Sequence, residues 1–384
     1  MVTKRYFKPP ERTSYFLFGP RGTGKSTLMA ALYPDALLIN LLLPDTRRPY
    51  LAKPDRLLDV VRAQPEGKTI VIDEVQKIPE LLSLVHVLIE EKQQWQFVLT
   101  GSSARKLKRE GVNLLGGRAL DKHLHPFMAS ELGEGFDLQQ ALNSGLLPLA
   151  VASDTVQETL SAYVTLYLEE EVKAEGFIRD IEPFSHFLEV LSFSHGSLLN
   201  LSHVARECRL KRATVDNWLS IAEDLLIAFR LPVFSRRAKR ILTTQLKFYY
   251  FDSGVYQILR PRSVIDSRSE VGGAALEGLV AQHLRAWIDY SHAKHKLYYW
   301  RTKSGVEVDF IVYGEKGLWA IEVKYSGYVD SKDLRGLKNF KEDYPESTPI
   351  MLYQGDERIL RDGILCMPCD EFLKQLVPNQ SLPV

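Results

Sequence analysis

A glycine-rich segment near the start of the chain has the residue types and spacing of a phosphate-binding loop. Residues 19–26 match the pattern G-x-x-x-x-G-K-[ST] at every fixed position. Glycines let backbone N–H groups turn toward phosphate oxygens, and the N-terminus of the following helix favours their negative charge. We expect Lys25 to reach the β- and γ-phosphates and the Ser26 hydroxyl to bind Mg²⁺. The expected contacts to ATP are Gly19, Pro20, Arg21, Gly22, Thr23, Gly24, Lys25, Ser26 and Thr27.

Two acids at the end of an apolar stretch supply the second part of this chemistry. Asp73 and Glu74 directly follow the stretch Thr69–Ile72. Asp73 suits the coordination shell of Mg²⁺, and Glu74 suits a base that accepts a proton from the attacking water. The alternative for Glu74 is a cap of the next helix. Together the two acids favour hydrolysis of the nucleotide over binding alone.

A third polar group follows the apolar stretch Phe97–Leu99. Thr100 and Ser102 are candidates for sensing the γ-phosphate or orienting the attacking water. The alternative is that these residues form a simple turn.

These groups can meet only if the elements that carry them form one sheet. Short apolar strands alternate with helices through the first part of the chain, which predicts an α/β domain with a central parallel sheet. The expected strands are Tyr15–Phe18, Ala36–Leu43, Thr69–Ile72 and Phe97–Leu99, and the expected helices are Lys25–Tyr33 and Leu81–Glu91.

The three motifs together resemble those of the prokaryotic AAA+ ATPases with the AAA_14/DUF4143 architecture. The segment Leu115–Ala119 is also similar to that family. The resemblance implies that Arg118 is an arginine finger placed into a neighbouring subunit's site, where a guanidinium stabilises charge at the γ-phosphate. It therefore implies a homo-oligomer in the form of a ring. A structural salt bridge is the alternative for Arg118.

The middle of the chain has the spacing of a helix-turn-helix. Expected helices at Leu201–Arg209 and Thr214–Leu226 are followed by expected strands at Ile227–Phe234 and Leu246–Phe251, which predicts a winged helix with a basic wing. A packing module with a solvated basic loop is the alternative. The segment Leu246–Gly254 resembles the same family. The candidate DNA contacts are Lys211, Arg212, Asn217, Arg236, Arg237, Lys239 and Arg240.

A third constellation of acids lies in the last third of the chain. Asp309 is followed on the next expected strand by Glu322 and Lys324, which share one face, and Glu277 lies on the preceding expected helix. Carboxylates and a lysine facing one spot can hold Mg²⁺ and orient a water for phosphodiester cleavage. The pattern resembles the PD-(D/E)xK nuclease fold, a mixed α/β restriction-endonuclease-like domain. Whether such a domain cuts DNA or only binds it stays open.

Length and composition bound these hypotheses. The chain has 384 residues, a net charge of +1 and three cysteines. We expect three domains, at 1–135 for the P-loop ATPase domain, 136–265 for the helical linker and winged helix, and 266–384 for the nuclease-like domain. The apolar runs are too short to span a bilayer, so we expect no membrane contact and a cytoplasmic location. Near-neutral charge means that DNA binding requires a local basic patch.

Two functions are compatible with these features. The first is an ATP-hydrolysing DNA-processing motor of the helicase, translocase or branch-migration type, with possible Mg²⁺-dependent endonuclease activity. The second is a signalling ATPase whose nucleotide state controls a protein partner without cutting DNA. The basic segment and the Asp309, Glu322 and Lys324 set favour the first.

Overall fold

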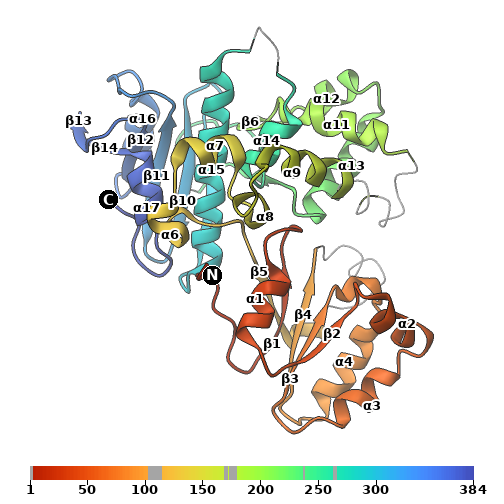
Figure 1. The fold of residues 1–384 in the computed structure, drawn as a ribbon. Helices are drawn as coiled ribbons and strands as arrows, with labels where there is room; N and C mark the ends of the chain where they lie inside the picture. The colour runs from red at the N-terminus through yellow and green to blue at the C-terminus, as the bar shows by residue number, and fades with distance from the viewer. Residues whose placement is uncertain (1–2, 103–114, 168–171, 173–179, 237, 263–265) are drawn as a thin grey trace. The chain divides into compact units, whose positions relative to one another are not determined.

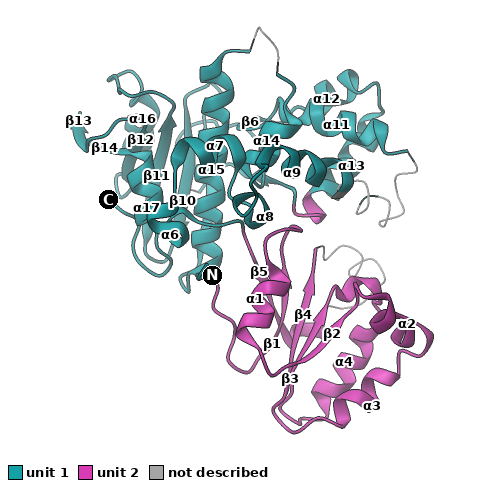
Figure 2. Cartoon of the chain, in the orientation of Figure 1, with its two compact units in different colours: residues 1–6, 126–222, 227–384 teal, residues 7–125, 223–226 magenta. Residues whose placement is uncertain are grey.

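The chain folds into two compact units. The computed structural model describes residues 3–102, 115–167, 172, 180–236, 238–262 and 266–384 (Figure 1). Unit 2 contains residues 7–125 together with 223–226, and unit 1 contains the rest of the chain (Figure 2). Within the described residues, no helix combines the length and the apolar composition needed to cross a membrane.

Unit 2 is built on a five-stranded parallel sheet in the order β2-β3-β4-β1-β5. Strands β1 and β4 are buried at every residue, as is typical of the central strands of a parallel sheet covered by helices. This confirms the predicted α/β class. The strands are β1 (Ser14–Phe18), β2 (Leu37–Asn40), β3 (Thr69–Asp73), β4 (Gln96–Gly101) and β5 (Ala119–His123), and the helices are α1 (Lys25–Leu32), α2 (Pro44–Ala52), α3 (Arg56–Arg62) and α4 (Leu81–Glu90).

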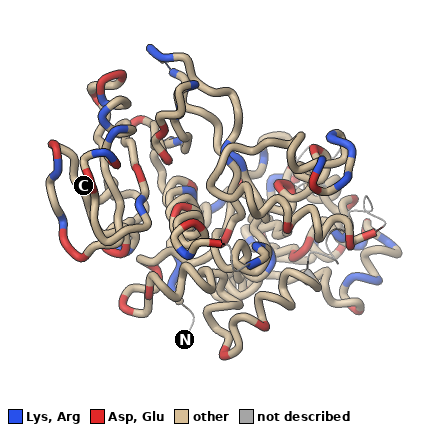
Figure 3. Tube along the Cα trace, turned by 90° about the horizontal axis from the view of Figure 1, so that it is seen from above, with Lys and Arg blue, Asp and Glu red and all other residues tan. Residues whose placement is uncertain are grey.

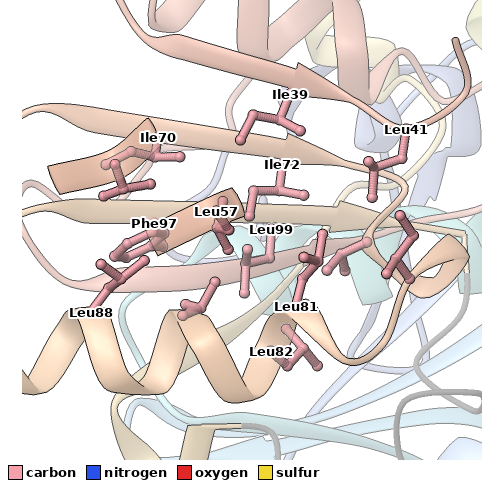
Figure 4. Packing of buried hydrophobic residues seen from close by; sticks show 14 of the residues in the cluster. Ile39, Leu41, Leu57, Ile70, Ile72, Leu81, Leu82, Leu88, Phe97 and Leu99 are labelled. Atoms are coloured by element: carbon pink, nitrogen blue, oxygen red, sulfur yellow. The ribbon is translucent and has the colours of Figure 1, made fainter. Parts of the chain in front are cut away.

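One face of this sheet packs on α3 and α4. Leu81 and Leu88 of α4 lie at helical spacing against Phe97 and Leu99 of β4 and Ile72 of β3, and all five are at most 1% exposed (Figure 4). This core fixes β3 and β4 side by side, so that their polar ends are held by rigid elements.

Strand β4 lies between β1 and β3. Phe18 at the end of β1 pairs with Gly101, and Ile72 of β3 pairs with Leu99. Because all three strands are parallel, their carboxyl ends meet at one edge of the sheet. The glycine-rich loop after Phe18 and the two expected acids therefore converge at this edge.

The first part of unit 1 after residue 126 consists of small helices, among them the consecutive pair α12 and α13. Helix α13 buries the stripe that contains Val215 and Trp218, and Trp218 packs edge-on against Phe184 and Phe187 of α11. The helices of this part are α6 (Ala129–Leu132), α7 (Leu138–Ser144), α8 (Pro148–Val151), α9 (Val156–Ala162), α11 (Glu182–Ser192), α12 (Leu201–Glu207), α13 (Arg212–Asp224) and α14 (Ser253–Leu259).

Two sheets complete unit 1. A three-stranded sheet has the order β6-β8-β7, and a six-stranded mixed sheet has the order β13-β14-β12-β11-β10-β9. The long helix α15 (Arg268–Tyr290) contacts β8, β9 and β11. The other elements are β6 (Ser197–Leu198), β7 (Ala228–Leu231), β8 (Lys247–Tyr250), β9 (His295–Arg301), β10 (Glu307–Gly314), β11 (Gly317–Lys324), α16 (Arg335–Asp343), β12 (Thr348–Tyr353), β13 (Ile359–Arg361), β14 (Ile364–Pro368) and α17 (Cys369–Gln375).

The first residues of the chain belong to unit 1 although unit 2 follows them in sequence. The carboxylate of Glu131 accepts a hydrogen bond from the Tyr6 backbone N–H at 2.6 Å and forms an ion pair with Arg5 at 3.1 Å. The Arg5 guanidinium also lies over the Phe127 ring. In sequence, unit 2 is thus inserted between residues 1–6 of unit 1 and the remainder of that unit.

A buried aspartate joins the parts of unit 1. Asp252 caps α14 by accepting the N–H groups of Gly254 and Val255 at 2.9 and 3.1 Å, and it also accepts the N–H of Leu146 at 2.8 Å. Its side chain leaves no space for a Cβ at Gly145, which ends α7 with a φ of 68°.

We predict that Asp252→Ala lowers the free energy of unfolding by about 2–4 kcal/mol, because it removes a cap and leaves the buried N–H of Leu146 without an acceptor. The matched control is Asp137→Ala, which removes the exposed cap of α7 and should cost only about 1 kcal/mol. Denaturant unfolding of the two variants measures the difference. Equal losses would contradict the linking role of Asp252.

Candidate functional site

The glycine-rich loop wraps around the start of α1 at the carboxyl edge of the sheet in unit 2. Gly22 and Gly24 have φ values of 81° and 87°, which only glycine adopts without strain. A Cβ at Gly19 would lie 2.5 Å from the Leu124 carbonyl oxygen, so the loop passes close to the backbone after β5. The Thr23 hydroxyl donates to the Pro20 carbonyl at 2.8 Å and closes the loop.

The Lys25 side chain lies over this loop. Its ammonium donates to the Gly19 carbonyl at 2.6 Å and to the Pro20 carbonyl at 3.2 Å, and the residue is 6% exposed. Ser26 and Thr27 next to it are exposed, as is Arg21. The loop therefore presents backbone N–H groups, a lysine and a hydroxyl at one helix N-terminus, which is the donor set that a triphosphate needs.

A carboxylate bridges the loop and the next strand end. The Ser26 hydroxyl donates to Asp73 Oδ2 at 2.8 Å, and the Thr100 hydroxyl donates to Asp73 Oδ1. Asp73 is 2% exposed and Thr100 is fully buried. Oxygen ligands from a carboxylate and an adjacent hydroxyl fit Mg²⁺, so Ser26 and Asp73 are placed to hold a nucleotide-bound magnesium ion.

Glu74 lies just beyond β3 in a backbone conformation that is rare for a non-glycine residue. Its φ and ψ are 61° and 47°, and its N–H reaches Thr100 Oγ1 at 3.4 Å. Such strain persists where surrounding contacts impose it, and it is common at functional sites. It lies at the edge where the loop, Asp73 and Thr100 meet.

Gln76 was not among the expected site residues, but its amide contacts two of them. Its Nε2 donates to Glu74 Oε2 at 2.6 Å and to Ser102 Oγ at 3.1 Å. A Cβ at Gly101 would lie 2.5 Å from Gln76 Oε1, so the strand tip admits this amide only because it carries glycine. The sequence offered one indication that Gln76 belongs to the site, namely its position two residues after Glu74.

Arg118 lies at the opposite edge of the same sheet. It precedes β5, whose Ala119 pairs with Ser14 at the start of β1, whereas the phosphate loop follows Phe18 at the end of β1. Five residues of strand span about 13–17 Å. The guanidinium forms an ion pair with Glu90, and this contact lowers the pKa of that exposed carboxyl. Arg118 is therefore placed away from the phosphate loop of its own chain.

The expected DNA-contacting residues fall into two groups. Lys211, Arg212 and Asn217 are exposed at the start of α13, after a turn in which Arg209 has a φ of 53°. Basic and acidic positions are interspersed along the trace (Figure 3), in keeping with the net charge of +1. The start of α13 is thus a local basic site rather than part of a general positive field.

The second group corrects the prediction of a free basic wing. Arg240 forms ion pairs with Asp343 at 3.0 Å and Glu342 at 2.8 Å, and Lys239 donates to the Glu342 carbonyl at 3.4 Å. The Arg236 guanidinium lies over the Tyr313 ring. This segment packs on the six-stranded sheet because Phe234 enters its apolar core. Arg237 lies outside the described residues.

The expected acids of the C-terminal sheet do converge, but on an unexpected lysine. The Lys247 ammonium, on a side chain that is 2% exposed, lies 2.6 Å from Glu277 Oε1, 2.6 Å from Glu307 Oε1 and 2.9 Å from Asp309 Oδ1. Glu322 faces the same cluster from β11, and its Oε2 is buried without a hydrogen-bond partner in the described structure. We call these four carboxylates and Lys247 the Lys247 cluster.

Lys324 takes a different direction from the one expected. Its ammonium binds Asp333 Oδ1 at 2.7 Å, and its side chain is 42% exposed. The lysine of the cluster is therefore Lys247 from β8 and not the lysine of the sequence motif. Asp309 itself is oriented by a register shift of β10 between Val308 and Ile311, and its Oδ2 accepts the Val323 N–H at 3.0 Å.

A magnesium ion does not fit this cluster. Carboxylate oxygens of Glu277 and Asp309 that would ligate it already contact the Lys247 ammonium. A divalent ion about 4 Å from a unit positive charge is repelled by roughly 8 kcal/mol at an effective dielectric constant near 20. Within the described part of the chain, no group of three or more His, Cys, Asp or Glu side chains is placed to hold a metal ion.

Three family models match successive parts of the chain. Residues 11–133 match the model described as an AAA domain, residues 135–265 match a domain of unknown function (DUF8612), and residues 272–372 match a domain of unknown function (DUF4143). Together with the loop and the acids described above, the first match supports an AAA-type ATPase.

The similar proteins have no assigned role. Uncharacterized proteins of Mycobacterium tuberculosis and Mycobacterium bovis are each 26% identical over 366 residues, covering 93% of this chain and 80% of theirs. An uncharacterized protein of Haemophilus influenzae is 22% identical over 291 residues, covering 71% of this chain and 70% of its own. Among solved structures, the ADP form of the Aeropyrum pernix ORC2 protein aligns with 12% identity and a TM-score of 0.30, covering 70% of this chain and 88% of its own.

We predict that Thr100→Val lowers the affinity for Mg²⁺-ATP and the rate of hydrolysis by about 10–100-fold, because Asp73 loses a hydrogen bond that orients it. Thr100→Ser keeps the hydroxyl and should stay within a few-fold of the wild type. A magnesium titration of ATP hydrolysis separates the two variants. Unchanged magnesium dependence in Thr100→Val would contradict the role assigned to this hydroxyl.

Proposed function

We propose that this protein hydrolyses ATP with Mg²⁺ and uses the energy to act on DNA, as a motor of the helicase, translocase or branch-migration type. The observation that carries the hydrolysis is the chain of hydrogen bonds from Ser26 through Asp73 to Thr100. It joins the phosphate loop to two strand ends in the way that a magnesium-dependent phosphoryl-transfer site requires. When bound, Mg²⁺ supplies charge neutralisation at the phosphates.

The other side chains at this edge have separate roles in the proposal. Lys25 exchanges its contacts to loop carbonyls for phosphate oxygens. Glu74 orients and deprotonates the attacking water, and its hydrogen bond from Gln76 holds its carboxylate near Ser102. Thr100 positions Asp73 and does not itself need to touch the phosphate.

Arg118 completes the proposal as a finger that acts on a neighbouring copy. Its place at the far edge of the sheet supports a role in trans and not at the phosphate loop of its own chain. The proposed assembly is therefore a homo-oligomer, with a ring as the simplest closed form. The competing role is the ion pair with Glu90.

DNA binding is proposed for the start of α13. Lys211, Arg212 and Asn217 are exposed where the second helix of a helix-turn-helix begins, and this end contacts phosphates and base edges in such motifs. We propose three functional regions at 1–135, 136–265 and 266–384. The family-model matches at 11–133, 135–265 and 272–372 support this division.

A second candidate function is a nucleotide-switched ATPase that controls a protein partner. Two observations favour it. Arg240 and Lys239 are committed to contacts with α16, which removes them from a DNA-binding wing. The Lys247 cluster also does not fit the magnesium that a nuclease requires, so we propose no DNA cleavage.

We predict that double-stranded or branched DNA raises the ATPase rate of the wild type. The double variant Lys211→Ala/Arg212→Ala should bind DNA more weakly, and the slope of its log affinity against log salt concentration should fall by the amount expected for the loss of about two phosphate contacts. The matched control is Lys294→Ala/Lys296→Ala, two exposed lysines before and within β9. Lys25→Ala should remove hydrolysis in every condition.

Fluorescence anisotropy at several salt concentrations and an ATPase assay test this. No stimulation by any form of DNA, together with no salt-sensitive binding, would rule out the motor and leave the protein-partner switch.

We predict that Arg118→Ala lowers the hydrolysis rate by about a hundredfold or more, the effect of losing an arginine finger. Mixing Arg118→Ala with the inactive Lys25→Ala should restore part of the activity. In mixed assemblies one subunit supplies an intact phosphate loop and its neighbour supplies the arginine. Glu90→Ala serves as the control for the ion pair. No recovery on mixing, with equal losses in Arg118→Ala and Glu90→Ala, would favour the structural role.

A further inference from the structure

The strand β8 carries a lysine into the interior of unit 1, where the sequence motif predicted a metal. Its ammonium contacts carboxylates from two other elements, α15 and β10, at 2.6–2.9 Å. We propose that Lys247 is the permanent cation of the Lys247 cluster, so that these carboxylates bind an internal ammonium in place of a catalytic metal ion. This inference does not depend on the proposed ATPase function.

The charges of the cluster balance without a metal. Glu307 is shared between Lys247 at 2.6 Å and Arg301 at 2.5 Å, and Asp309 contacts Lys247 at 2.9 Å. Burial, and then the charge of Asp309, raises the pKa of Glu277 to about 8 and the pKa of Glu322 well above its usual range. Burial therefore opposes the ionisation of all four carboxyls at once, and the cluster already contains two cations, Lys247 and Arg301, at contact distance.

The lysine itself stays charged in this environment. Burial lowers the pKa of Lys247, but the charges of its neighbours, Asp309 first among them, together raise it by more, so that the pKa lies well above the usual range. A buried ammonium with several carboxylate partners is a stable arrangement, whereas one without them is not. A neutral, displaced Lys247 that would free the site for a metal is thus disfavoured.

A second side chain of β8, that of Tyr249, also binds Glu277 of α15. Lys247 and Tyr249 share one face of the strand because side chains alternate. The Tyr249 hydroxyl donates to Glu277 Oε1 at 2.5 Å, the oxygen that also contacts Lys247. An ion that replaced the ammonium would therefore break three ion pairs and disturb this hydrogen bond.

Manganese binding to the full chain without nucleotide tests the proposal, with electron paramagnetic resonance as the readout. The proteins are the wild type, Asp309→Asn, Lys247→Met and Lys247→Met/Asp309→Asn. We expect the wild type and Asp309→Asn to bind Mn²⁺ equally weakly. Lys247→Met should bind one Mn²⁺ at least about tenfold more tightly, since the carboxylates then lack a cation, and the double variant should lose this gain. The matched control is Lys324→Met, whose exposed lysine binds Asp333 and should change nothing.

Two results would overturn the proposal. One is tight binding of Mn²⁺ to the wild type that Asp309→Asn removes, because the cluster would then accept a metal beside Lys247. The other is a folded Lys247→Met protein with no gain in Mn²⁺ binding. If Lys247→Met does not fold, the comparison of Mn²⁺ binding by the wild type and by Asp309→Asn decides the question alone. Cutting of DNA by the wild type with Mn²⁺, if Asp309→Asn abolishes it, would also contradict the proposal.

Discussion

A lysine ammonium shielded from water and bound by carboxylates is the constraint on which unit 1 depends. Burying a charge is costly unless it is paired, and removing one partner of such a buried pair typically costs about 3–5 kcal/mol. Lys247 therefore fixes β8 to α15 and β10. Because β8 pairs with both β6 and β7, the same contact places the helix-turn-helix against the C-terminal sheet. One ion-pair network thus holds two regions of different sequence character as a single compact unit.

At the nucleotide site, too, a buried charged side chain is bound by groups from several elements. Asp73 is buried, and both of its oxygens accept hydrogen bonds, one from the phosphate loop and one from the end of β4. Glu74 is held in a left-handed conformation beside it, and Gln76 binds its carboxylate. Asp73 is thus oriented by groups from the loop and from β4, so the order of the strands in the sheet contributes to the geometry of the site as well as the loop.

Motifs whose members lie close together in the sequence come together in the structure at the edge of the sheet where the sequence placed them. The loop at 19–26, the acids after β3 and the polar end of β4 are local patterns, and the helices and strands around them follow from apolar periodicity. The Lys247 cluster was not predictable in this way. Lys247 lies 30 residues from Glu277 and 62 from Asp309, so the three residues belong to different elements and no helical or strand repeat in the sequence relates them. A lysine at the start of an otherwise aromatic buried strand was the available signal. The basic segment failed for a related reason: the acids of α16 that bind Arg240 lie about a hundred residues further on.

The contact of Arg5 and Tyr6 with Glu131 has a consequence for how the protein is made. These two residues are synthesised before residues 7–125, and their partner Glu131 follows only after the whole of that segment. The inserted unit has its own sheet and core, so it can fold while the segment before it waits. The contact of Arg5 and Tyr6 with Glu131 then closes a loop of more than a hundred residues that contains an already folded domain. Because most of the loop is already ordered within that domain, the entropy lost on closing it is smaller than for a flexible chain of equal length.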